Sequence, residues 1–231
     1  MNAPDDPAYG TAGDIFRALA PHARAEVEHL ISYRSYPSGH VFHAPNEVGN
    51  QLFVLRTGRV RIYKLAPEGR ALTLMVLEPI TIFGEMSLVG QGLHDTFAEA
   101  TSACVIGVIE RTTLRHILER YPQVAIASME LMGQRLRAME HKLADLAFKS
   151  VPQRLASVLL NLAGMPVGQG QPAAQPNVVR VTHQQLAELI GSYRETVTKA
   201  IGDMREAGLV RSEDDALALI DLAQLQRLAN G

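Results

Sequence analysis

The chain has 231 residues, of which 47% are hydrophobic and 20% charged, and its formal net charge is -2. This balance is ordinary for a globular protein of one large or two modest domains, and its single cysteine, Cys104, excludes a disulfide framework and a metal or iron–sulfur site built from cysteines alone. No apolar run approaches the roughly 20 residues of a membrane span, and the small, acidic first residues are unlike a signal peptide, so we expect a cytoplasmic protein with no membrane partner.

The first predicted elements are a leader, a short helix and a β-rich region. Residues 1–13 are expected to be a disordered leader. Residues 14–30 predict an amphipathic helix, whose apolar side carries Ile15, Phe16, Leu19, Val27 and Leu30. Over residues 35–109, short alternating apolar runs are separated by glycine or proline, as in an antiparallel barrel or jelly roll. We therefore predict a β-roll domain over residues 14–120, with Cys104 buried in a strand.

A long dimerisation helix is predicted next, over residues 121–149. From Pro122 to Phe148 it would be on the order of 40 Å long, at about 1.5 Å per residue. Apolar side chains recur along it at alternating spacings of three and four, the pattern of a coiled-coil seam. They are Met129, Met132, Leu136, Met139, Leu143 and Leu146. The seam favours a parallel homodimer, although these side chains could instead pack on the chain's own β-domain.

Residues 181–210, VTHQQLAELIGSYRETVTKAIGDMREAGLV, predict two short helices joined by a tight turn. Thr182 and Ser192 are each followed three residues later by Gln or Glu, which fits the capping box at a helix start. Gly191 can take the left-handed conformation that ends the first helix. Such a pair places its second helix in a DNA major groove, although similar pairs also occur in all-α cores that bind no nucleic acid.

The second of these helices carries its polar side chains on the side away from its apolar stripe. The stripe consists of Val197, Ala200, Ile201 and Met204. The predicted DNA-binding residues are Arg180, Thr182, Ser192, Tyr193, Arg194, Glu195, Thr198 and Lys199. Because the chain is not strongly basic, binding would depend on a few cations doubled by a two-fold dimer on double-stranded DNA.

Residues 150–231 as a whole predict a winged helix–turn–helix domain. A helix over residues 150–162 precedes a Gly-, Pro- and Gln-rich loop. After the two DNA-reading helices, the runs LVRSE and ALALID predict a β-hairpin wing, followed by a last helix over residues 222–228.

The order of these parts and three segments resemble the Crp/Fnr family of bacterial transcription regulators. The segments are LFVLRTGRVRIYKLAPEGRALTLMVLEPITIFGEMSL, LAFKSVPQRLASVLLNLAG and LIGSYRETVTKAI. The resemblance covers nearly the whole chain, and it implies an α+β protein with an N-terminal β-roll like a cyclic-nucleotide-binding domain, a long dimerisation helix and a C-terminal winged helix–turn–helix.

The same resemblance implies how the protein would read DNA. Residues 192–197 are similar to the family's S-R-E-T-V motif, with Tyr193 as an additional or substituted residue. Arg194 and Glu195 would then read guanine and cytosine edges in a palindromic operator, with Lys199 at the place of a second basic contact. Activation is the family's commoner mode, and residues 164–177 correspond in position to a surface through which relatives touch RNA polymerase.

The predicted effector pocket departs from the pattern of the family's cyclic-AMP sensors. Gly84 and Glu85 match the pair that holds the ribose, although a carboxylate beside a turn glycine also serves simply to hold a loop. The Arg-Ser pair for the cyclic phosphate is replaced by the sequence HDT at residues 94–96. Without the arginine the phosphate loses its bidentate partner, and Asp95 would repel it.

Residues 139–140, Met and Glu, stand where the Thr-Ser pair for the adenine would be. The candidate effector residues are Gly84, Glu85, Thr96 and Arg135. Our preferred interpretation is a homodimer that binds DNA with no cofactor, and a cyclic-AMP-dependent regulator is the alternative.

Three further classes fit the residues less well. An iron–sulfur sensor needs several N-terminal cysteines, and a haem sensor needs axial ligands, whereas the histidines here have no fixed spacing. Gly39, His40, His43 and Glu47 are similar to a cupin metal motif, so a cupin-like metal enzyme is a remote alternative. However, histidines three apart point to opposite faces of a regular strand. No nucleophile elbow, phosphate loop or zinc-protease helix marks an enzyme, so we predict neither metal ligands nor catalytic residues.

Overall fold

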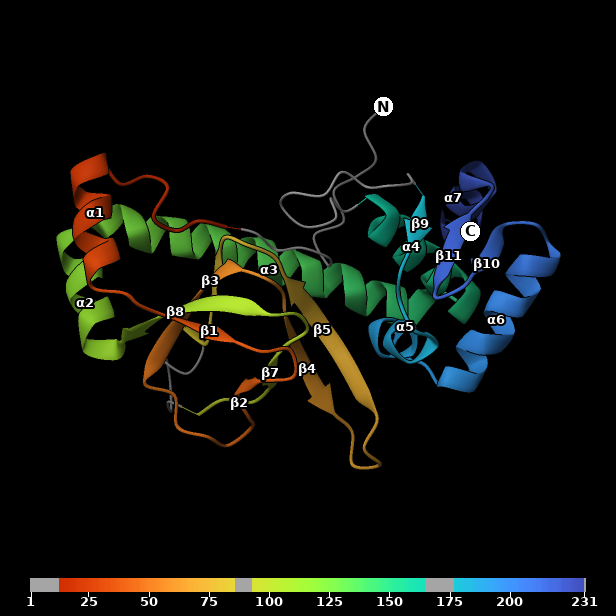
Figure 1. Ribbon diagram of the computed structural model, residues 1–231, viewed down its shortest axis with the longest axis horizontal. Helices are drawn as coiled ribbons and strands as arrows, with labels where there is room; N and C mark the ends of the chain where they lie inside the picture. The colour runs from red at the N-terminus through yellow and green to blue at the C-terminus, as the bar shows by residue number, and fades with distance from the viewer. Residues whose placement is uncertain (1–12, 86–92, 165–176, 231) are drawn as a thin grey trace. The chain divides into compact units, whose positions relative to one another are not determined.

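The computed structural model describes residues 13–85, 93–164 and 177–230 (Figure 1). The chain divides into two compact units. Of the described residues, the N-terminal unit contains 13–64, 74–85 and 93–139, and the C-terminal unit contains 65–73, 140–164 and 177–230. Residues 1–12 of the predicted leader and most of the predicted loop at residues 164–177 lie outside the described residues.

The N-terminal unit begins with turns and a short helix, so the prediction of one helix over residues 14–30 was wrong. Helix α1 spans Pro21–His29. Ala20 is extended, with φ -60° and ψ 152°, because a residue that precedes proline avoids the helical region. Four of the predicted apolar side chains are buried, Ile15, Phe16, Leu19 and Val27. Leu30 is 48% exposed and does not belong to that face.

Two four-stranded sheets make up the β-roll, in agreement with the predicted fold class. The first has the strand order β1-β8-β3-β6, and the second has the order β2-β7-β4-β5. The strands are β1 (Ser32–Tyr36), β2 (Val41–His43), β3 (Gln51–Thr57), β4 (Val60–Leu65), β5 (Ala71–Leu77), β6 (Thr81–Phe83), β7 (Phe97–Ala100) and β8 (Cys104–Glu110).

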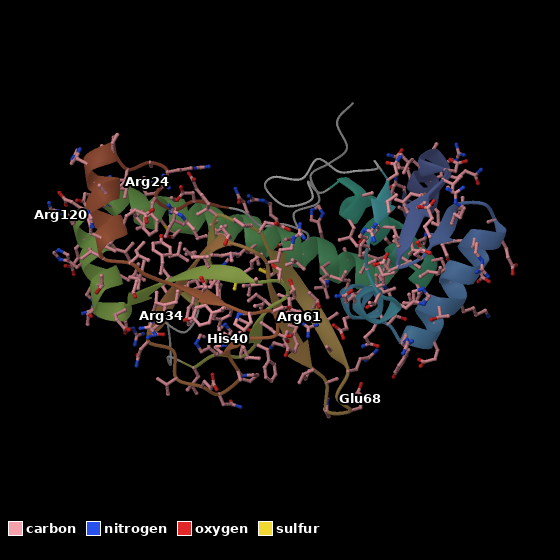
Figure 2. The ribbon with its side chains drawn as sticks, viewed as in Figure 1. Arg24, Arg34, His40, Arg61, Glu68 and Arg120 are labelled. Atoms are coloured by element: carbon pink, nitrogen blue, oxygen red, sulfur yellow. The ribbon has the colours of Figure 1, made fainter. Side chains whose placement is uncertain are left out.

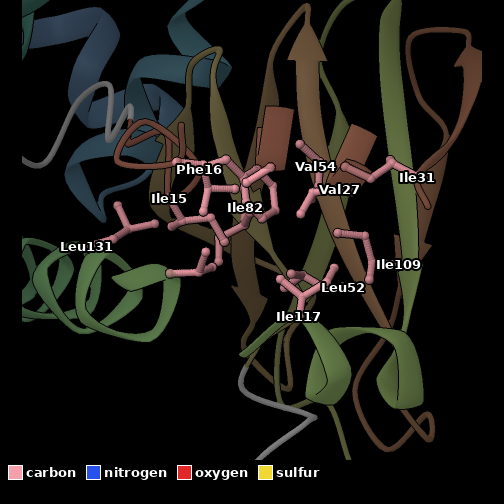
Figure 3. Packing of buried hydrophobic residues seen from close by; sticks show 13 residues of the cluster. Ile15, Phe16, Val27, Ile31, Leu52, Val54, Ile82, Ile109, Ile117 and Leu131 are labelled. Carbon is pink, nitrogen blue, oxygen red and sulfur yellow. The ribbon is translucent and has the colours of Figure 1, made fainter. Parts of the chain in front are cut away.

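Strand β3 has buried side chains on both of its faces, which explains its continuous apolar run. Leu52 and Val54 belong to a cluster that also includes residues of α1 and of the helices after β8 (Figure 3). Phe53 and Leu55, on the opposite face, join a second cluster with β4, β7 and β8, which contains the buried Cys104. Successive side chains of a strand alternate between faces, so this one strand contributes to both cores.

Helix α2 (Arg111–Arg120) leads into α3 (Pro122–Phe148), the long helix that the sequence predicts. One side of α3 is buried and carries Val124, Leu131, Arg135 and Ala138. The predicted seam divides into two series. Met129, Leu136 and Leu143 are 65%, 61% and 68% exposed, whereas Met132, Met139 and Leu146 are half-buried. Met132 packs against the first core cluster, so the seam partly follows the alternative of packing on the chain's own β-domain.

The C-terminal unit has the predicted order of helices and a small sheet. Its elements are α4 (Val151–Gly164), β9 (Val178–Val179), α5 (His183–Ile190), α6 (Arg194–Glu206), β10 (Val210–Glu213), β11 (Ala216–Leu219) and α7 (Leu222–Asn230). The wing has three strands in the order β10-β11-β9, one more than predicted. Side chains from α4, α5 and α7 that are fully buried, among them Leu155, Leu186 and Leu225, form the core. Among the described helices, none combines the length and the apolar character needed to cross a membrane.

Candidate DNA-binding surface and effector pocket

The turn between α5 and α6 begins from a well-capped helix. The Thr182 hydroxyl accepts from the backbone N–H of Gln185 at 3.1 Å, and the Gln185 side-chain oxygen accepts from the Thr182 N–H at 2.9 Å. Gly191 ends α5 in the left-handed conformation, with φ 65°. A Cβ there would also lie 3.0 Å from Leu146 Cδ2. The predicted capping box at Thr182 and the role of Gly191 are therefore confirmed.

The predicted second capping box, at Ser192, was wrong. The N-cap of α6 is Tyr193, one residue later, and its side chain makes no capping hydrogen bond. Ser192 is buried, at 8% exposure, so we leave it out of the proposed DNA contacts. Glu195 lies in the first turn of α6 instead, where its charge interacts favourably with the helix dipole.

Helix α6 presents an exposed polar face opposite its buried stripe. Val197, Ala200, Ile201 and Met204 are buried, as predicted. The side chains predicted to meet DNA on the other side are exposed, namely Arg194, Glu195, Thr198 and Lys199. In the described parts of the chain, neither Arg194 nor Lys199 forms a salt bridge. These two cations therefore have no acidic partner that a phosphate or a base would have to displace.

Two other predicted DNA-binding residues have internal partners. Arg180 Nη1 forms an ion pair with Asp215 Oδ1 at 2.6 Å, and both side chains are largely exposed. The Tyr193 ring lies beneath the Arg70 guanidinium, 4.7 Å from ring centroid to Cζ, within the C-terminal unit. Both contacts are at the surface, so each is worth only a modest free energy.

The sequence interpretation missed His183, the first residue of α5. Its Nδ1 lies 2.9 Å from the Thr198 hydroxyl oxygen. The same hydroxyl donates to the carbonyl oxygen of Arg194 at 2.9 Å. This link between the two helices joins residues 15 positions apart, and no local sequence pattern would indicate it.

Three of the four predicted effector residues come together where β6 faces α3 in the N-terminal unit. Arg135 is buried and its Nη1 forms an ion pair with Glu85 Oε1 at 2.7 Å. Arg135 Nη2 also donates to the Thr81 hydroxyl at 3.2 Å and to the Ile82 carbonyl. Gly84, with φ 83°, supplies the turn before Glu85, and a Cβ there would lie 3.0 Å from Phe53. Among the described residues, Glu85 Oε2 has no hydrogen-bond partner although it is buried.

The fourth predicted effector residue, Thr96, is linked to a pair of histidines instead. The His43 and His94 rings are stacked, with centroids 3.8 Å apart and planes 8° apart. His43 Nδ1 lies 2.9 Å from the Thr96 carbonyl oxygen, which can only accept. Burial and, after it, the charge of a protonated His94 together lower the pKa of His43 to about 4. Burial also lowers the pKa of His94.

Charged side chains on strand β4, which pairs with β7, already have partners. Lys64 Nζ lies 3.2 Å from Asp95 Oδ2. Arg61, labelled in Figure 2, pairs with Glu99 across β4 and β7 at 3.0 Å and lies over the Tyr63 ring. This part of the N-terminal unit therefore contains a buried Arg–Glu pair and an imidazole pair, and Arg135 and Arg61 are held by carboxylates.

The two histidines of the cupin-like motif have different surroundings. The His40 ring contacts the Tyr36 ring, 4.5 Å between centroids, whereas His43 stacks on His94. Across the described ranges, no group of three His, Cys, Asp or Glu side chains is placed to hold a metal ion.

Family models of known protein domains match both halves of the chain. Residues 33–121 match the family model of the cyclic nucleotide-binding domain, and residues 153–228 match that of the Crp-like helix-turn-helix domain. The CRP-like cAMP-activated global transcriptional regulator of Mycobacterium tuberculosis is 32% identical over 219 residues, which cover 93% of this chain and 96% of that protein. The chain belongs to the Crp/Fnr family of transcription regulators. The resemblance seen in the sequence is thus confirmed.

Other Crp/Fnr regulators are similar over nearly the same length. The cyclic AMP receptor protein of Thermus thermophilus is 30% identical over 94% of this chain and 97% of its own. A solved structure of a CRP/FNR-family regulator from the same organism has a TM-score of 0.73 at 30% identity, covering 87% of this chain and 99% of that one. The c-di-GMP responsive regulator CLP of Xanthomonas campestris shares the fold, with a TM-score of 0.80 at 21% identity over 87% and 100% of the two chains.

Proposed function

We propose that this Crp/Fnr regulator binds a palindromic operator as a homodimer in the cytoplasm, without cyclic AMP, and activates transcription by contacting RNA polymerase. The observation that supports DNA reading most directly is the exposed polar face of α6. Arg194 can donate two hydrogen bonds to guanine O6 and N7, and Glu195 can accept from cytosine N4. Lys199 would act as a point charge rather than a bidentate donor. The proposal includes no enzymatic activity.

The exposed series on α3 supports the dimer. Met129, Leu136 and Leu143 are seven residues apart, so they lie on one stripe of the helix, and each is more than half exposed. A second α3 packed along this stripe would remove these side chains from water. It would also supply the two-fold axis that a palindromic operator requires.

The independence from cyclic AMP is supported by the chemistry of the effector pocket. Residues 86–92 contain no arginine or lysine, and Arg61 is paired with Glu99. Asp95 is exposed and already pairs with Lys64, so its carboxylate would compete with a cyclic phosphate for that cation. Met139 can offer no hydrogen bond to an adenine comparable to that of a hydroxyl.

One observation favours the alternative, a regulator that needs cyclic AMP. Glu85 Oε2 is buried and has no partner in the described parts of the chain, so it could accept from a ribose hydroxyl. Two relatives that are at least 30% identical are named as a cAMP-activated regulator and a cyclic AMP receptor protein.

The test is DNA binding measured by fluorescence anisotropy at fixed salt, with and without cyclic AMP. Duplexes would first be selected from a random palindromic pool by the purified protein. We expect specific binding without nucleotide, lost in Arg194→Ala. Arg180→Ala is the matched control, because Arg180 is already paired with Asp215, and it should weaken binding to all sequences by a similar, smaller factor.

Each outcome decides between the proposals. Binding that appears only with cyclic AMP would establish the alternative. Equal affinity for selected and scrambled duplexes would contradict sequence-specific binding. For the activator role, transcription from a promoter carrying the selected operator would be measured with purified RNA polymerase. A fall in transcript on adding the protein would show repression instead.

A further inference from the structure

Two hydrogen bonds hold the hydroxyl of Thr198, the only polar group of a side chain on the exposed face of α6. The Thr198 hydroxyl donates to the Arg194 carbonyl at 2.9 Å and lies 2.9 Å from His183 Nδ1. A hydroxyl has one proton. If that proton goes to the carbonyl, which can only accept, His183 Nδ1 must carry its own proton and donate to the hydroxyl oxygen. If the proton goes to His183 instead, it is still used within the protein.

In both arrangements, the Thr198 hydroxyl has no proton left to donate to DNA. The side chain is nevertheless exposed, and its Cγ2 methyl is the group without a polar role. Thr198 is four residues after Arg194 and three after Glu195, so these residues share one face of the helix, with Thr198 one turn further on. A methyl group presented to the major groove matches one base feature, the C5 methyl of thymine.

We propose that Thr198 recognises a thymine by methyl contact, at a base pair near the one read by Arg194 and Glu195, and that His183 is the positioning residue that holds Thr198 in this orientation. This inference rests on the proposed DNA-binding function. It assigns a role to His183, and it changes the predicted role of Thr198 from a hydrogen-bond donor to an apolar contact.

The test removes single methyl groups from either side of the contact. In the operator selected by the protein, each thymine is replaced in turn by deoxyuridine, which lacks only the C5 methyl. At one position in each half-site, we expect this change to weaken wild-type binding about fourfold, the value of one buried methyl-sized group. The affinity ratio between thymine and deoxyuridine at that position is the readout.

Two variants of Thr198 test its methyl group and its hydroxyl separately. Thr198→Ser keeps the hydroxyl and its hydrogen bonds but lacks the methyl, so its ratio should fall to about one. Thr198→Val lacks the hydroxyl but keeps a methyl, and valine in a helix strongly prefers one χ1 rotamer without any hydrogen bond, so its ratio should stay above one. If the ratio survives in Thr198→Ser or disappears in Thr198→Val, the hydroxyl is the reading group and the proposal is overturned.

Variants of His183 test the positioning role. His183→Ala should lower the thymine-to-deoxyuridine ratio while the loss of binding caused by Arg194→Ala remains. His183→Asn should restore the ratio, because its amide can donate from nearly the place of Nδ1. An unchanged ratio in His183→Ala would overturn the role of His183. Thermal unfolding checks that each variant is folded.

The failure of this inference can be told apart from the failure of the proposed function. If no duplex binds specifically and Arg194→Ala changes nothing, the proposed function fails and the inference falls with it. If binding is specific and lost in Arg194→Ala, but no thymine methyl matters, only the inference is overturned.

Discussion

At the scale of single residues, the unusual chemistry of this protein lies in its buried polar side chains. His43 is 5% exposed, and burial, followed by the nearby His94, lowers its pKa from 6.5 to about 4. The hydrogen bond to the Thr96 carbonyl and the charges of Glu47 and Asp95 oppose this shift without cancelling it. The folded protein therefore keeps His43 neutral at a pH where the unfolded chain protonates it.

We predict that the free energy of unfolding falls as the pH falls from about 6.5 towards 4. Between these values the unfolded state binds more protons, so this contribution is complete above about pH 6.5 and is lost on acidification, by on the order of 3 kcal/mol. Urea unfolding at about pH 7 and about pH 5 would measure it. His43→Gln should remove most of the difference, whereas the exposed His116→Gln should leave it unchanged. Equal pH dependence in wild type and His43→Gln would contradict the assignment.

The buried Arg135–Glu85 pair gives a second prediction at this scale. Removing one partner leaves a buried charge without its counter-charge, so Arg135→Met should cost about 3–5 kcal/mol of unfolding free energy. Helix α3 offers a matched control, because Glu130 pairs with Arg17 at 3.0 Å with both side chains more than half exposed. Arg17→Met should cost less than about 1 kcal/mol. Similar losses in the two variants, measured by urea unfolding, would show that the Arg135 pair is effectively solvated.

At the scale of elements, sequence patterns predicted which helices and strands exist better than where they begin. The long seam of α3, the apolar stripe of α6 and the wing are periodic over enough residues to be seen locally. The start of α6 cannot be seen locally. Ser192 is buried after the left-handed Gly191, and the helix begins only at Arg194. Strand β9 has two residues, too few for any period.

The residues of the candidate sites also divide into those that a local sequence pattern predicts and those that it does not. Arg194 and Glu195 could be predicted from a local motif, and the structure leaves both exposed. The contacts of His43 with His94 and of His183 with Thr198 join different elements. They depend on strand pairing and helix crossing, which no window of the sequence contains. Arg135 was singled out from the sequence, yet its burial against Glu85 follows only from how α3 packs on the β-roll.

The two capping-box motifs give a prediction for elements, because only one of them forms. Thr182→Ala removes a hydroxyl that accepts from the Gln185 N–H, so it should cost about 1 kcal/mol of unfolding free energy. Ser192→Ala removes the corresponding hydroxyl from the other motif, which forms no cap. It should therefore cost less than about 0.5 kcal/mol of unfolding free energy. Chemical denaturation of both variants would compare them. A larger loss from Ser192→Ala would mean that its hydroxyl has a role that the cap geometry does not explain.

At the scale of the whole molecule, the proposed dimer would connect assembly to DNA binding through the exposed stripe of α3. Met129, Leu136 and Leu143 are exposed in the single chain, and a dimer would cover them. Two copies of α6 would then reach two half-sites, and the phosphate contacts would double. Affinity for a palindrome would thus depend on the same apolar side chains that hold the dimer together.

We predict that Leu136→Glu produces a monomer, because it would place two carboxylates against each other in the proposed seam. Sedimentation would show this, and Leu30→Glu, which changes another exposed leucine outside the seam, should remain dimeric. The monomer would use half as many cations on a palindromic duplex, so the slope of log affinity against log salt should fall to about half. A Leu136→Glu protein that stays dimeric with an unchanged slope would place the dimer contact elsewhere. A monomer with an unchanged slope would instead show that the operator is read by one copy at a time.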